Sequence, residues 1–147
     1  MHRLTKTAGL VLAVALVLEA SDARAELFSK AYAFKPDTTL KVGAEIPGGL
    51  RLDSVEFVLP KVDAQAGTFD GPKVKVSISN LGATSMKVGV AIAITDADGR
   101  LVAVASGGTK VFPLRADRQI VYTLSIDNVR AELLKGTVFR ISVEPTP

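Results

Sequence analysis

The stretch that decides the fold runs from residue 73 to residue 106 and reads KVKVSISNLGATSMKVGVAIAITDADGRLVAVAS. Apolar residues alternate with small or polar ones over three segments. Successive side chains of a strand point to opposite faces of a sheet, so a period of two predicts β-structure. We therefore expect three consecutive antiparallel strands. The residues expected to face the core are Val74, Val76, Ile78, Met86, Val88, Val90, Ile92 and Ile94.

Two turn signals separate these strands. Asn80-Leu81-Gly82 opens the first connection, and Asp96-Ala97-Asp98-Gly99 predicts a hairpin turn in which Gly99 takes a positive φ. An Asp-x-Asp pair also begins several calcium loops, but such loops need further oxygen ligands at later positions. Arg100 and Leu101 follow instead, already in strand alternation. The sequence thus favours turn chemistry over a metal site.

The same alternation continues on both sides of this stretch. Further strands are expected at 40–46, 50–59, 119–126 and 137–143, with an edge piece at 111–114 that is interrupted by Pro113. The apolar face of 50–59 changes side near Ser54, which predicts a β-bulge. One short helix is expected near 127–135, where Asp127 or Asn128 can cap it. Short strands at regular spacing predict an all-β, immunoglobulin-like sandwich of two antiparallel sheets, with a closed barrel as the alternative.

The strand ending in Asn80, the long alternating strand, the Asp96-x-Asp98-Gly99 turn and the late strand after a charged turn resemble small bacterial immunoglobulin-like domains. The likeness is to domains of the FxLYD and fibronectin type III kind, and it covers residues 74–126, about half of the chain after residue 25. The Phe-x-Leu-Tyr-Asp signature itself is missing, and Ala93-Ile94-Thr95-Asp96 stands in its place. The resemblance implies interaction or spacer roles and no chemistry.

The first 25 residues have the order of a secretory signal peptide. Arg3 and Lys6 precede an apolar run at 8–18, and Ala23-Arg24-Ala25 is a small-x-small ending. A membrane span, the alternative, needs about 20 apolar residues, and Glu19 ends this run early. We expect cleavage after Ala25 and a periplasmic or secreted protein that no longer spans the membrane. Residues 40–147 would then form the sandwich, and residues 26–39 an N-terminal arm or first edge strand.

That N-terminal arm carries Phe28, Tyr32 and Phe34. One interpretation is a strand that packs on the edge of its own domain. The other is an extended arm that adds to the sheet of another subunit through main-chain hydrogen bonds. The three aromatic residues are therefore candidate partner-binding residues.

The residue types after position 25 exclude most catalytic sites. The chain has no Cys and no Trp, and its single His is His2. Neither a Ser-His-Asp nor a Cys-His arrangement can be built from residues 26–147, nor a zinc site that needs imidazole or thiolate. Asp53, Glu56, Asp63 and Asp70 are close in sequence, but nothing indicates that they converge on a cleft. We expect no enzyme activity and no cofactor.

Charge gives one further candidate site. Residues 26–147 carry 15 basic and 13 acidic residues, too small an excess to predict nucleic-acid binding. Lys73 and Lys75 alternate with apolar residues, and Lys87 is expected on a neighbouring strand. The three lysines are either an ordinary solvated sheet face or a weak patch for anionic groups.

The sequence favours a non-catalytic binding or spacer module that acts through protein–protein interaction, with another envelope protein or itself as the partner. The alternative is a carrier of a small ligand or glycan. Its pocket would lie between the sheets or at a loop end, with Gly48-Gly49 and Gly107-Gly108 as mobile rims.

Overall fold

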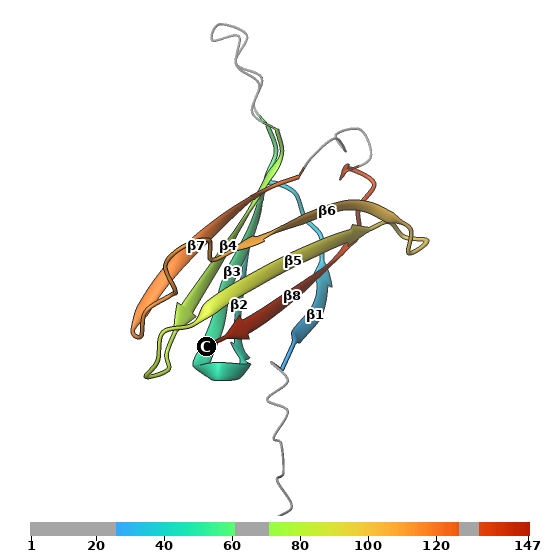
Figure 1. Cartoon of the computed structure of the whole chain (residues 1–147). Coiled ribbons are helices and arrows are strands. Elements are labelled where there is room, and N and C mark those ends of the chain that lie inside the picture. Colours follow the sequence, from blue (N-terminus) through green and yellow to red (C-terminus); the bar gives the residue numbers. More distant parts are fainter. Residues whose placement is uncertain (1–25, 61–70, 127–132) are drawn as a thin grey trace, which may run out of the picture.

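The chain forms two antiparallel four-stranded sheets packed face to face (Figure 1). The computed structural model describes residues 26–60, 71–126 and 133–147. Sheet 1 has the order β1-β8-β5-β6, and sheet 2 has the order β2-β3-β4-β7. The predicted all-β sandwich is confirmed, and its two separate sheets replace the closed barrel. The strands are β1 (Phe28–Ala33), β2 (Thr39–Ile46), β3 (Leu50–Val58), β4 (Lys73–Asn80), β5 (Lys87–Thr95), β6 (Leu101–Gly108), β7 (Arg118–Ser125) and β8 (Val138–Thr146), and the 3-10 turn η1 (Pro47–Gly49) joins β2 to β3.

The chain changes sheet after β1, β4, β6 and β7. The deciding stretch is therefore divided, since β4 lies in sheet 2 while β5 and β6 form a hairpin in sheet 1. The three expected strands are present, and they are divided between the two sheets. The connection 81–86 carries the chain from one layer to the other.

The core is built from the inward faces that the alternation predicts. All eight predicted core residues of the deciding stretch are buried, as are Tyr122, Leu124, Phe139, Ile141 and Val143. Ile120 of the edge strand β7 is 37% exposed, although Ile78 opposite it on β4 is fully buried. Edge-to-face contacts join the two sheets, with ring centroids 4.9 Å apart for Phe57 and Phe139.

Both predicted irregularities of the strands occur. The register between β3 and β4 shifts between Leu52 and Ser54, which is the bulge expected near Ser54. Gly99 takes φ 77° in the hairpin turn. One Asp96 carboxylate oxygen accepts hydrogen bonds from the amides of Asp98 and Arg100, each at 2.9 Å. This carboxylate stabilises the turn, as the sequence favoured.

Two other predicted segments have different outcomes. Most of the predicted helix, residues 127–132, lies outside the described residues; Leu133 is helical and buried. The predicted edge piece at 111–114 is reduced to one isolated bridge, in which Leu114 pairs with Met86. Pro113 accounts for this, because proline cannot donate to a strand ladder.

Candidate functional site

The outer face of sheet 2 holds a hydrogen-bonded carboxylate, Asp53. Asp53 lies at the bulge in β3, and its side chain reaches residues of β4 and β7. Asp53 accepts hydrogen bonds from Ser79 Oγ at 2.6 Å, from Arg51 Nε at 2.7 Å and from Gln119 Nε2 at 3.0 Å. Desolvation opposes ionisation, but the hydrogen bonds from Ser79, Gln119 and Arg51 outweigh it and hold the pKa of Asp53 below its usual value. A carboxylate with its acceptors occupied and a lowered pKa is a structural group and a poor proton acceptor.

The other carboxylates singled out in the sequence do not gather around Asp53. Glu56 forms an ion pair with Lys75 on the outer face of sheet 2, with 3.5 Å between Oε2 and Nζ. Asp63 and Asp70 lie outside the described residues. Within the described ranges, His, Cys, Asp and Glu form no group of three that could hold a metal ion.

The three candidate anion-binding lysines do not share one face. Lys73 and Lys75 belong to β4 in sheet 2, whereas Lys87 begins β5 in sheet 1. The expectation that Lys87 lies on a strand next to Lys73 and Lys75 is wrong. It failed because the alternation defines strands but does not show where the chain passes to the other sheet.

The N-terminal arm pairs with the chain's own last strand. β1 runs antiparallel to β8, from Phe28 opposite Val143 to Ala33 opposite Val138. Phe28 and Tyr32 are half-buried against the core, and Phe34 is buried. The three candidate partner-binding residues are thus brought together on the inner side of their own domain. Pairing with a second copy stays a prediction, and it would require β1 to leave β8.

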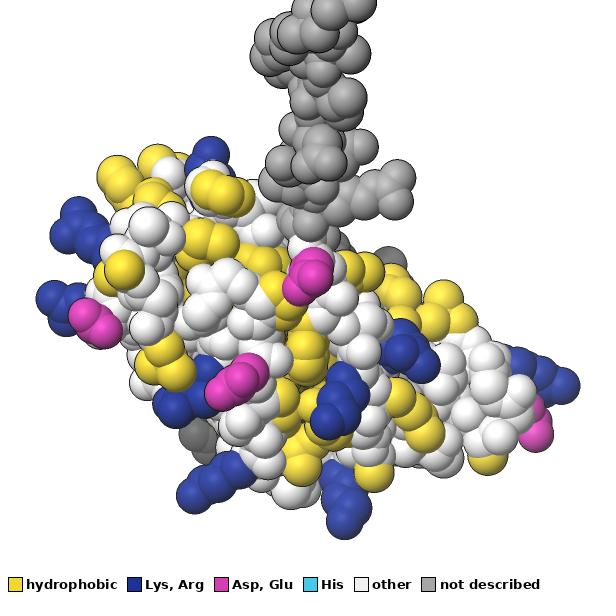
Figure 2. All heavy atoms as spheres, turned by 90° about the horizontal axis from the view of Figure 1, so that it is seen from below, with side chains coloured by type: hydrophobic (Ala, Val, Ile, Leu, Met, Phe, Trp, Pro, Cys, Tyr) yellow, Lys and Arg dark blue, Asp and Glu magenta, His cyan; other side chains and the backbone are white. Residues whose placement is uncertain are grey.

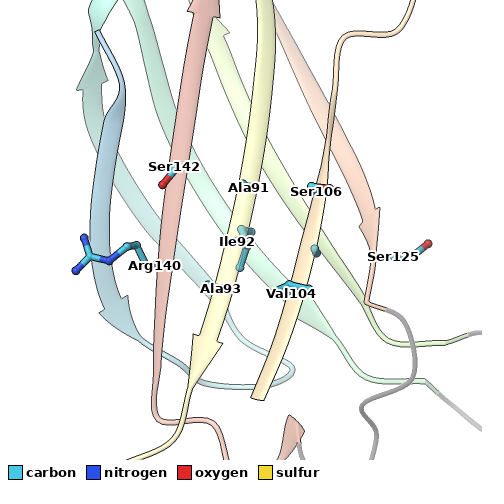
Figure 3. A pocket seen from close by; sticks show the side chains of 9 residues that line it. Ala91, Ile92, Ala93, Val104, Ser106, Ser125, Arg140 and Ser142 are labelled. Atoms are coloured by element: carbon cyan, nitrogen blue, oxygen red, sulfur yellow. The ribbon is translucent and has the colours of Figure 1, made fainter. Parts of the chain in front are cut away.

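A shallow hollow of about 450 Å³ lies on the outer face of sheet 1. Figure 3 shows small side chains from β5, β6 and β8 spread across it, while the Arg140 guanidinium points away from them towards β1. The Ser125 hydroxyl also points outwards. Binding sites for small molecules bring a few polar groups together over an apolar surface. Here the polar groups diverge, so the hollow lacks the arrangement of an active site.

The glycine pairs proposed as mobile rims have packing roles instead. Gly107 and Gly108 lie within β6, and a Cβ on Gly108 would collide with the Val88 carbonyl oxygen. A Cβ on Gly49 would stand 2.9 Å from the Gly82 Cα, because η1 packs directly against the loop after β4. These glycines allow close approach of two backbones.

At one end of the sandwich, buried Asn80 fastens two loops together. Its Nδ2 donates to the Thr84 carbonyl at 2.8 Å and to the Leu114 carbonyl at 2.9 Å, and its Oδ1 accepts from the Gly82 amide at 3.0 Å. The loops 81–86 and 109–117 therefore lie side by side at the end where β8 also terminates (Figure 1). We call this the basal end.

The loop 109–117 exposes two large apolar side chains at the basal end. Phe112 is 82% exposed and Val111 is 74% exposed, and Leu81 of the adjacent loop is 56% exposed. Figure 2 views the molecule from below and shows hydrophobic side chains at the surface, with more basic than acidic side chains around them. Lys110 and Arg115 flank the two apolar residues in the sequence, and both are exposed. Exposed apolar side chains that gather in one place are typical of interaction surfaces.

The sequence reading missed this feature. It interpreted 111–114 as an edge strand, although Pro113 in the segment KVFPLR argued for a loop. The signal for an exposed loop was the apolar pair Val111-Phe112, which lies between Lys110 and Arg115 and directly before Pro113.

Comparison of the chain with models of known protein families finds no match, and comparison with curated proteins finds none either. The resemblance to FxLYD and fibronectin type III domains therefore rests on the quoted residues alone. The described part of the chain contains no helix with the length and apolar character needed to cross a bilayer.

Proposed function

We propose that this protein is a non-catalytic binding module that is exported to the periplasm or cell surface and docks another envelope protein through its basal end. The observation that carries the proposal is the exposure of Phe112 on a loop whose neighbour Leu114 is fixed by buried Asn80. Large aromatic side chains dominate the energetics of protein interfaces.

The charge around Phe112 points to the chemistry of the partner. Lys110 and Arg115 lie on the same loop, and Lys87 begins the strand that follows the adjacent loop. A partner with an apolar pocket rimmed by carboxylates would complement this arrangement. Such complementarity raises the association rate and discriminates between partners more than it raises affinity.

The residue types of the chain agree with a role without catalysis. Positions 26–147 contain neither His nor Cys, which removes the commonest general base and the strongest nucleophile of proteins. Asp53, the carboxylate with the lowered pKa, has its oxygens occupied by hydrogen bonds. Export is supported by the basic start, apolar run and small-x-small ending of the first 25 residues.

Site-specific photocrosslinking in intact cells tests the docking surface. A photoreactive phenylalanine analogue replaces Phe112 in one strain. In the control strain it replaces Val104, which is 55% exposed on the outer face of sheet 1. Both positions are exposed and apolar, so non-specific capture should be equal. We expect one discrete protein adduct from position 112 and none from position 104.

A substitution completes the test. Phe112→Ser should abolish copurification of the captured protein, while Val104→Ser should leave it unchanged. Both variants should retain the melting temperature of the parent, because each side chain is mostly in water. Equal adducts from both positions, adducts with lipid only, or copurification that survives Phe112→Ser would each contradict the proposal.

A further inference from the structure

A narrow apolar slot opens between the sheets on the side away from the β6–β7 contact. The two sheets close on each other where β6 meets β7. On the other side, β1 and β2 are the free edges of their sheets, and a slot of about 220 Å³ lies between them. Figure 1 shows both strands on this side of the molecule. Its apolar walls come from both sheets, with Tyr32 and Phe139 from sheet 1 and Leu40, Val55 and Phe57 from sheet 2.

Aromatic contacts hold these walls in place. Phe139 stacks on Tyr32 with ring centroids 5.5 Å apart and meets Phe57 edge to face at 4.9 Å. The connector from β1 to β2 is fixed as well, because the Asp37 amide donates to the Phe57 carbonyl and its carboxylate accepts from the Leu59 amide, each at 2.9 Å. The aromatic walls and the connector are therefore held in place before a ligand binds, which lowers the entropic cost of binding.

One polar atom of the slot-lining residues is left without a partner. The Tyr32 hydroxyl is buried and makes no hydrogen bond within the described part of the chain. Tyr122, the other tyrosine, hydrogen-bonds to the Thr109 hydroxyl at 3.0 Å. An unsatisfied buried hydroxyl is uncommon in native proteins and calls for an explanation. Burial raises the pKa of Tyr32, so the hydroxyl keeps its proton and remains a donor at neutral pH.

The mouth of the slot is polar, whereas its walls are apolar. Lys35, Thr38 and Thr39 line it, and all three residues are exposed. The carboxylate of Asp37, which belongs to the same connector, is engaged by the Leu59 amide. A cation at the entrance of an apolar slot fits a ligand with one anionic end and one apolar end.

We propose that this slot binds a small aromatic carboxylate, with the ring between the two sheets and its negative charge towards Lys35, and that a rotation of the Tyr32 side chain lets its buried hydroxyl donate to an oxygen of the ligand. The volume suits this class, since a dry apolar cavity of about 150 Å³ admits benzene. The slot is about 220 Å³, which leaves room for a short acidic substituent. This site is independent of the basal end, so failure of either proposal leaves the other intact.

Titration of the full chain with phenylacetate and with its uncharged amide tests the site by calorimetry. We expect saturable one-to-one binding of phenylacetate with a Kd of about 0.1–1 mM, and binding of the amide at least about 5-fold weaker. Tyr32→Phe should weaken phenylacetate binding about 5-fold or more without lowering the melting temperature. Tyr122→Phe should leave the affinity unchanged, because Tyr122 does not line the slot.

Two further variants make the result decisive. Leu40→Trp fills the slot from a half-buried position and should abolish binding. Lys35→Gln should remove most of the preference for the carboxylate over the amide, whereas Lys110→Gln at the basal end should not. Absence of saturation up to about 10 mM phenylacetate, equal affinity for acid and amide, or binding that survives Leu40→Trp would overturn the proposal.

Discussion

Replacement of Asn80 by Ala should be among the most destabilising single changes at the basal end. Asn80 is fully buried, and its side chain makes three hydrogen bonds that join the two basal loops. Each such bond contributes about 1 kcal/mol to the free energy of unfolding, and the loss of a buried side chain adds a cavity term. The Leu114 carbonyl keeps a second donor, the Met86 amide at 2.9 Å, which limits the penalty. We therefore expect a loss of about 3 kcal/mol.

Urea denaturation measures this loss as a shift of the midpoint at constant slope. Thr84→Ala is the matched control, because it truncates an exposed side chain in the same loop and keeps the carbonyl that accepts from Asn80. The control should stay within about 0.5 kcal/mol of the parent. If the losses for Asn80→Ala and Thr84→Ala agree within about 0.5 kcal/mol, Asn80 does not hold the basal loops as we infer.

Three further predictions concern the outer face of sheet 2, the core, and the contact between β5 and β6. Asp53→Asn should cost about 2 kcal/mol at neutral pH. Because the pKa of Asp53 is lowered in the folded protein, its stabilisation is present above the unfolded pKa of about 4 and is lost as pH falls through the folded value. The variant should thus lose less stability than the parent as the pH is lowered. If the free energy of unfolding falls equally steeply with pH in both proteins, the ionised Asp53 carboxylate does not stabilise the fold as inferred. Tyr122→Phe should cost about 1 kcal/mol and Tyr32→Phe about none, since only the former hydroxyl has a partner; equal thermal shifts would contradict the assignment. Gly108→Ala should cost about 2 kcal/mol or more because its Cβ meets the Val88 carbonyl, and an unchanged urea midpoint would show that the strands can move apart.

Period-two alternation was sufficient to predict most of the strands and their buried faces. The inward sets of β4, β5 and β8 follow directly from it, because burial of one face fixes the side on which apolar residues lie. The bulge near Ser54 could also be predicted from the sequence, since the apolar residues change side of the strand there. Gly99 marked the hairpin turn for the same local reason, its freedom to take a positive φ.

The assignment of strands to sheets was not readable in this way. β4 and β5 look alike as sequences, yet they lie in opposite sheets. Nothing in their alternation shows which layer a strand joins, because both layers bury the same kind of face. This is why Lys87 was placed beside Lys73 and Lys75 when it belongs to the other sheet.

The candidate sites depend on contacts that are distant in sequence. At the basal end, Asn80 hydrogen-bonds to Leu114, which is distant in sequence. The slot is lined by residues of β1, β2, β3 and β8. The Tyr32 hydroxyl could not be identified as unpartnered before its neighbours were known. Composition alone showed which sites cannot be built. Residues 26–147 contain no His and no Cys, so sites that need imidazole or thiolate could be excluded from the sequence.

The most direct test of the central claim, docking through the basal end, is a hydrogen-exchange footprint of the protein in complex with the partner captured at position 112. We expect slower amide exchange in the segments 81–86 and 109–117 on binding. Exchange at Ala91 and Ser106, on the outer face of sheet 1, should be unchanged. Protection confined to that outer face, with the two basal loops unaffected, would contradict the account.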